Sequence, residues 1–163
     1  MRKVLTSLTM LSCFLVFTSH LNGTPAQEHQ PVIYVKHLAP PLRYPQLARQ
    51  AQLQGTVVIR VKIGSDGSVL AAKPLTHDED PQANAHPLLR DETEKLVKNW
   101  TFGCANCSSD KSYEKTIKFT YRLEGEGIPY DDTRVSMDLP DEVIVTASPV
   151  ECDHCPPKKK SNK

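Results

Sequence analysis

Four cysteines in two C-x-x-C pairs are the residues of this 163-residue chain with the clearest capacity for chemistry. One pair is Cys104 and Cys107, and the other is Cys152 and Cys155 near the C-terminus. Two such pairs are compatible with structural disulfides, a tetrathiolate zinc site or a redox-active dithiol. Export of the chain, predicted below, favours disulfides, and the sequence does not choose among the three connectivities. Zinc and thiol chemistry stay as alternatives.

The elements predicted around the two pairs do not favour the redox alternative. A reactive thiolate is stabilised at a helix N-terminus, whereas Cys104 follows the predicted C-terminal end of a helix, where the helix dipole has the wrong sign. Cys155 is followed by Pro156-Pro157 and a lysine run, with neither a helix nor a βαβ unit. Because Lys158–Lys160 can lower the pKa of a nearby thiol, a thiol function remains open.

The other polar residues show no catalytic arrangement. The histidines at 29, 37, 77 and 86 have no carboxylate or serine at the spacing of a hydrolase motif. The acidic loop His77–Asp80 is predicted to be solvated. We therefore predict a non-enzymatic protein without a cofactor, apart from the zinc alternative. A net charge of +1 gives no broad field for a polyanion, so nucleic acid is not a predicted partner.

Residues 1–26 are predicted to be a signal peptide that directs export to the periplasm or the medium. Arg2 and Lys3 precede the apolar run Val4–Phe17. That run is shorter than the roughly 20 residues that a membrane span requires, so no stable membrane span is predicted. Lipidation at Cys13 and an uncleaved anchor are the two alternatives. Residues 27–43 form a proline-containing lead-in, in which Val32–Val35 is either an edge strand or extended linker.

Residues 44–125 are predicted to form one α+β domain. The runs Thr56–Ile63 and Tyr113–Leu123 alternate apolar and polar residues, which is typical of strands with one buried face. A tight turn at Ser65-Asp66-Gly67 leads from the first run into a strand at Ser68–Ala72. The prediction is a three-stranded antiparallel sheet with two helices packed on one face.

The two helices are predicted from proline starts and apolar spacing. Pro45 suits the first position of a short helix that stops before Gly55. A second helix begins at Pro87 and carries an apolar stripe that ends at Trp100. Trp100 is therefore predicted to be a core residue.

In this order the elements resemble the C-terminal domain of TonB, the periplasmic energy transducer of bacteria with two membranes. The motifs that carry the resemblance are Tyr44-Pro45 with Leu47-Ala48, Gly55–Val61, Ser65–Val69, Lys98–Phe102 and the run into Phe119. The chain departs from the transducers in having a short apolar run in place of a full anchor and no long proline-rich spacer. Gly103-Cys104 stands where many relatives have proline.

The resemblance implies a protein-binding function. The family captures a segment of an outer-membrane receptor by adding it as an extra strand to the exposed sheet edge. In this sequence the implied edge is Thr116–Arg122, and Lys118 and Arg122 would favour an acidic partner segment. The implied partner-binding residues are Tyr44, Pro45, Thr116, Lys118, Thr120 and Arg122. Outer-membrane transport or energy transduction is the implied context.

The tail, residues 126–163, contains two short runs typical of strands. These are Val135–Leu139 and Glu142–Thr146, with Pro140-Asp141 between them as a turn. We predict that Val143–Val145 pairs with the domain's own sheet and covers the edge that a partner strand would use. The alternative is a tail that packs elsewhere or folds when a partner binds. The final run Lys158–Lys163 is predicted to be solubilising.

Overall fold

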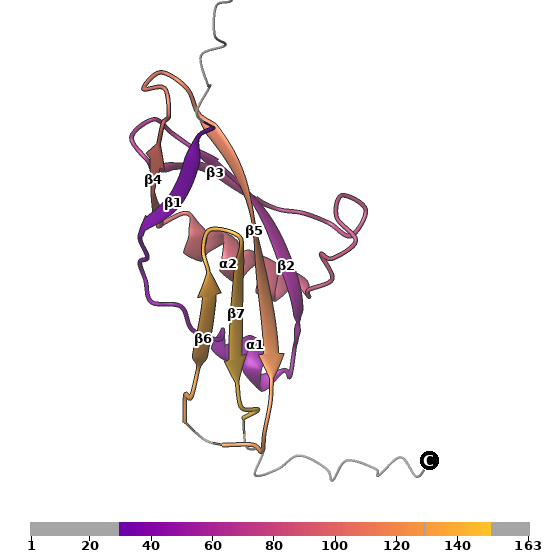
Figure 1. The fold of residues 1–163 in the computed structure, drawn as a ribbon. Helices are drawn as coiled ribbons and strands as arrows, with labels where there is room; N and C mark the ends of the chain where they lie inside the picture. Colours follow the sequence, from indigo (N-terminus) through magenta and orange to yellow (C-terminus); the bar gives the residue numbers. More distant parts are fainter. Residues whose placement is uncertain (1–29, 129, 151–163) are drawn as a thin grey trace, which may run out of the picture.

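The computed structural model describes residues 30–128 and 130–150 (Figure 1). The predicted signal peptide, Cys152, Cys155 and the basic C-terminus lie outside these residues. The elements in chain order are β1 (Val32–His37), α1 (Gln46–Gln50), β2 (Gly55–Ile63), β3 (Val69–Pro74), α2 (Pro87–Val97), β4 (Thr101–Ala105), β5 (Tyr113–Leu123), β6 (Arg134–Asp138) and β7 (Glu142–Ala147).

The strands form a five-stranded sheet in the order β3-β2-β5-β7-β6 and a two-stranded sheet of β1 and β4. The neighbours β3, β2 and β5 are antiparallel, as predicted. The prediction of a three-stranded antiparallel sheet is nevertheless wrong. The tail adds two strands to the β5 edge, and one of them runs parallel to β5, so the large sheet is mixed. The second sheet arises because residues 101–105 pair with β1.

The core lies on one face of the large sheet, where the alternating residues of β2 and β5 point inward. Val57, Ile59, Val61 and Ile63 of β2 are at most 3% exposed. They pack with Ile117, Phe119 and Tyr121 of β5, with Ala48 of α1 and with Leu89 and Val97 of α2. Both helices lie behind the large sheet in Figure 1, on one face as predicted. Burial of this apolar face is the main contribution that holds the short helix α1 in place.

The second helix ends earlier than its apolar stripe suggests. It begins at Pro87, as predicted, and the Nδ1 atom of His86 accepts a hydrogen bond from the Leu88 backbone N–H at 3.2 Å. The last helical residue is Val97, and from Thr101 the chain is extended and pairs with β1. Trp100 is 1% exposed, so the prediction of a core residue is confirmed.

The tail pairs with the domain's own sheet. β7 runs parallel to β5 in a register that places Lys118 opposite Glu142 and Leu123 opposite Ala147. On its other side β7 pairs antiparallel with β6. Val143 and Val145 have no exposed surface and lie in the same core as Phe119. The predicted pairing of Val143–Val145 is confirmed.

The position of β7 between two strands leads to a prediction about amide exchange. Amides of an interior strand exchange only when the strand opens. The amides of Val143–Val145 in the free monomer are therefore expected to exchange far more slowly than random-coil amides. Hydrogen exchange followed by NMR measures this directly. Random-coil exchange rates at Val143–Val145 would contradict the pairing.

Candidate partner-binding edge of the sheet

The edge of β5 that faces away from β2 consists of two parts. The residues from Lys118 to Leu123 pair with β7. The Lys118 backbone N–H also donates to the Asp141 carbonyl oxygen at 2.9 Å. Residues 113–117 pair with β2 but not with β7. The predicted edge is therefore a strand-accepting edge in this structure, and a strand of the same chain is bound to it.

The outer face of this edge carries four of the predicted partner-binding residues. Thr116, Lys118, Thr120 and Arg122 share one face of β5, and Thr116 precedes the part that pairs with β7. Lys118 Nζ lies 2.7 Å from a carboxylate oxygen of Glu142, directly opposite on β7. Thr120 lies opposite Ile144, and Arg122 lies opposite Thr146. The lysine that was predicted to favour an acidic segment thus contacts an acidic residue of the tail.

The inner face of the edge is an apolar surface with one buried hydroxyl pair. The Tyr121 hydroxyl lies 2.9 Å from Thr93 Oγ1, and Thr93 donates to the Leu89 carbonyl oxygen. Burial raises the pKa of Tyr121 to about 12, so the phenol stays neutral at physiological pH. A strand bound here is therefore selected on this face by shape and apolarity rather than by charge.

The remaining two predicted residues are Tyr44, which packs beneath the edge, and Pro45, which precedes α1. Tyr44 is 4% exposed, and its ring packs edge-on against Tyr121 at a centroid distance of 5.4 Å. Its hydroxyl donates to the Leu53 carbonyl oxygen, and its backbone N–H donates to Thr133 Oγ1 at 3.1 Å. Desolvation by burial is the main cause that raises the pKa of Tyr44. Pro45 directly precedes α1. Tyr44 therefore packs against β5 from the core side, whereas Pro45 is placed at the start of α1.

A buried arginine that the sequence analysis did not identify joins α1 to the tail. Arg49 is 5% exposed, and its Nε donates to the Ser148 carbonyl oxygen at 2.5 Å. One Nη donates to the Ile128 carbonyl oxygen at 3.3 Å and lies 3.6 Å from a carboxylate oxygen of Asp132. Asp132 accepts hydrogen bonds from the backbone N–H and the hydroxyl of Ser148 at 2.9 and 2.7 Å. We call Arg49, Asp132 and Ser148 the Arg49 cluster.

The Arg49 cluster leads to a prediction about pH. The two hydrogen bonds from Ser148, and then the charge of Arg49, hold the pKa of Asp132 below its ordinary value of 3.8. A carboxyl group whose pKa is depressed by folding stabilises the protein above its unfolded pKa, and this contribution is lost as the pH falls. The free energy of unfolding is therefore expected to fall below about pH 5. Urea denaturation between pH 7 and pH 3 should show a smaller fall for Asp132→Asn. Equal falls for the two proteins would contradict a stabilising role for this carboxylate.

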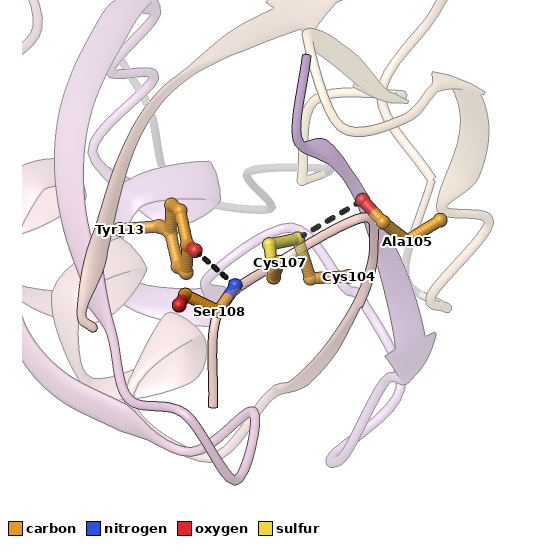
Figure 2. The surroundings of a disulfide bond; sticks show 5 residues. All are labelled: Cys104, Ala105, Cys107, Ser108 and Tyr113. Carbon is orange, nitrogen blue, oxygen red and sulfur yellow. Dashed lines mark hydrogen bonds between the residues drawn. A yellow bond between two sulfur atoms is a disulfide. The ribbon is translucent and has the colours of Figure 1, made fainter. Parts of the chain in front are cut away.

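The first C-x-x-C pair forms a disulfide that joins Cys104 of β4 to Cys107 in the connection to β5 (Figure 2). The Cα atoms of Cys104 and Cys107 are 5.7 Å apart, and Asn106 between them has a positive φ of 61°. The Ser108 backbone N–H donates to the Tyr113 hydroxyl at 2.6 Å, which joins this loop to the start of β5. The connectivity that the sequence left open is therefore within the pair, and the bond fixes a turn.

A cavity of about 300 Å³ lies beside the disulfide. It is bounded by Tyr34 and Lys36 of β1, the turn at 64–67, Phe102 and Tyr113. Within residues 30–128 and 130–150 no three histidine, cysteine or acidic side chains are grouped as metal ligands. The described part of the chain also contains no helix that is long and apolar enough to cross a membrane.

Comparison with protein families identifies the domain. The model described as "Gram-negative bacterial TonB protein C-terminal" matches residues 40–123, just over half of the chain. The chain belongs to the TonB C-terminal family. Domains of this family are non-enzymatic protein-interaction modules, generally periplasmic, that typically interact with outer-membrane receptors. Comparison with curated proteins and with solved structures gave no match.

The C-terminal end of the family match coincides with the end of the edge strand β5. The match ends at Leu123, which is also the last residue of β5. The TonB C-terminal segment therefore includes α1, β2, β3, α2, β4 and the edge strand β5. Both β1 and the β6–β7 hairpin lie outside it.

Proposed function

We propose that this protein is an exported, non-enzymatic binding module that recognises an extended segment of a partner protein by strand addition at the β5 edge. The partner would be an outer-membrane receptor segment, in the context of outer-membrane transport or energy transduction. Family membership supports the general function of protein interaction. The predicted signal peptide at residues 1–26 supports export.

The single observation that carries the proposal is the parallel pairing of β7 with β5. Backbone groups of residues 118–123 accept a six-residue strand, and the side chains of that strand alternate between core and surface. Strand addition has the same two components, because main-chain hydrogen bonds give affinity and pockets for alternate side chains give selectivity. β7 is thus an intramolecular example of the ligand that the edge binds.

The contacts of β7 define what a partner segment must contain. Val143 and Val145 enter the core beside Phe119 and Tyr121, so the inward positions require small apolar side chains. Lys118 faces the first residue of the bound strand, so an acidic side chain is favoured there. We therefore propose a segment with an acidic residue followed by alternating β-branched apolar residues, bound parallel to β5.

The test uses a full-length variant in which the edge is empty. The double substitution Val143→Asp and Val145→Asp places two carboxylates in the apolar core. Because burial of unpaired charges is costly, β7 is expected to leave the sheet. A synthetic peptide with the sequence of residues 139–149 is then added. It is expected to bind the variant and to raise its melting temperature, as measured by fluorescence anisotropy and circular dichroism.

The control is the same peptide with aspartate at the positions of Val143 and Val145. This peptide keeps the length and the glutamate of position 142 but cannot fill the inward positions. It is expected neither to bind nor to stabilise the variant. Failure of the unmodified peptide to bind the variant, or equal effects of the two peptides, would contradict strand addition at β5.

A further inference from the structure

We propose that the β6–β7 hairpin is an intramolecular inhibitor of the β5 edge, and that the Arg49 cluster holds it in the inhibiting position. This inference rests on the proposed function and concerns the regulation of the same site. A partner segment would bind only when the hairpin leaves the edge.

β7 and a partner strand would bind to the same backbone atoms of β5. β7 pairs with every residue from Lys118 to Leu123, and its side chains Val143 and Val145 fill the inward positions. The ammonium group of Lys118 likewise already forms an ion pair with Glu142. Two strands cannot pair with the same side of β5, so binding of a partner and binding of β7 are mutually exclusive. The observed affinity for a partner is then reduced by the fraction of molecules in which the edge is free.

The β6–β7 hairpin follows the segment that the family match covers. The family match stops at the end of β5, before β6 and β7 begin. Among the described strands, β6 pairs with β7 alone, and β7 pairs with β6 and β5. Departure of the hairpin therefore leaves the pairs β3–β2 and β2–β5 complete. Figure 1 shows the hairpin at one side of the large sheet, beyond β5.

An exposed connection after β5 provides a hinge for the hairpin. Glu124, Gly125, Glu126 and Gly127 are exposed and connect β5 to the segment that leads into β6. Gly125 has a positive φ of 87°, and a Cβ there would make only an ordinary contact with Ser148 Oγ, so the backbone at this point is not confined by packing. Movement at this connection would carry β6 and β7 together.

The Arg49 cluster holds the hairpin against the domain. The Arg49 guanidinium contacts both ends of the tail segment, since it binds the carbonyl oxygens of Ile128 before β6 and Ser148 after β7. Asp132 completes the arrangement by binding Ser148. Arg49 itself lies in α1, inside the family segment. The buried cluster thus joins the domain to both ends of the hairpin and would favour the closed state over the open one.

The experiment fixes the hairpin with a disulfide and compares this protein with a matched control. Thr120→Cys with Ile144→Cys joins directly opposite residues of β5 and β7 on the outer face of the sheet. Lys62→Cys with Glu114→Cys joins opposite residues of β2 and β5 on the same face, lies outside the predicted partner-binding residues and leaves the hairpin free. Both are made with Cys152→Ser and Cys155→Ser to prevent exchange, and the bonds are verified by peptide mapping. The probe is the peptide of residues 139–149.

The oxidised β5–β7 disulfide is expected to weaken peptide binding about 100-fold or more relative to the same protein after reduction, since the open state is removed. The β2–β5 disulfide and the wild type are expected to bind equally before and after reduction. The variant Arg49→Met is expected to bind about 10-fold more tightly than the wild type, because the closed state loses the cluster. Arg43→Met is its control, since Arg43 forms only an exposed ion pair with Asp131 at 3.8 Å.

The outcomes separate the inhibitor from the strand-addition site. Peptide binding to the Val143→Asp/Val145→Asp variant, together with loss of binding in the oxidised β5–β7 protein, supports both proposals. Binding to that variant with unchanged binding in the oxidised β5–β7 protein overturns the inhibitor and leaves the strand-addition site standing. No binding to the variant overturns both.

Discussion

The substitution Trp100→Ala is expected to lower the free energy of unfolding by about 3–5 kcal/mol. Trp100 is 1% exposed and lies between the end of α2 and the start of β4. Its ring centroid is 5.6 Å from that of Phe119 on β5 and 6.3 Å from that of Phe102 on β4. Removal of the indole therefore opens a cavity where the two sheets meet. Urea denaturation followed by far-UV circular dichroism measures the change, because the chain has one tryptophan and the variant has no tryptophan fluorescence.

The matched control for this experiment is Trp100→Phe. The Nε1 atom of Trp100 is buried and has no hydrogen-bond partner among the described residues. Phenylalanine removes this unpaired donor and keeps most of the aromatic contact, so its cost is expected to be less than half that of alanine. A Trp100→Ala protein that unfolds at the same urea concentration as the wild type would contradict the position of Trp100 in the core.

Period-2 patterns allowed the central strands to be predicted because each has one buried face. Val57, Ile59 and Val61 alternate with residues of the opposite face, and the same holds for Ile117 and Phe119. The β-branched run at Glu142–Thr146 was also enough to predict a strand and its partner, since a single unpaired edge lay a short connection away. Its parallel direction could not be predicted, because direction depends on how the connection of residues 124–133 crosses the end of the sheet.

The small sheet was missed because neither of its strands has a pattern of its own. Thr101–Ala105 contains Gly103 and a cysteine, has five residues and directly follows a strong helical stripe. β1 is flanked by prolines, so the sequence left it as strand or linker. Each of the two segments becomes a strand only because it pairs with the other. The ring of Tyr34 lies over Gly103, where a Cβ would come within 2.3 Å of it, and this contact is invisible in either segment alone.

Only the part of the candidate site that follows a local sequence pattern could be predicted. The outer-face residues Lys118 and Arg122 follow from the alternation of β5 and from the family resemblance. Arg49 gave no signal, because a single arginine in a short helix is usually solvated. Its burial depends on carbonyl oxygens of Ile128 and Ser148, which lie 79 and 99 residues away in sequence. Long-range polar contacts of this kind have no local pattern.

The substitution Gly67→Ala is expected to lower the free energy of unfolding by more than about 3 kcal/mol. Gly67 closes the turn between β2 and β3 with a positive φ of 85°. A Cβ there would lie about 2.0 Å from the Phe102 carbonyl oxygen, a backbone atom of β4 that has no freedom to rotate away. The Phe102 backbone N–H also donates to the Gly67 carbonyl oxygen at 2.8 Å, so relief of the collision would break this bond. The turn would be forced away from β4 and from the base of the small sheet.

Gly125→Ala separates this collision from the cost of the backbone conformation. Gly125 has nearly the same φ, 87°, but the nearest atom to a Cβ there is Ser148 Oγ at 3.5 Å. Its substitution is therefore expected to cost only the strain of a left-handed residue, about 1 kcal/mol. Urea denaturation of the two variants beside the wild type gives the difference directly. Equal losses at the two glycines would mean that the β2–β3 turn does not press on β4.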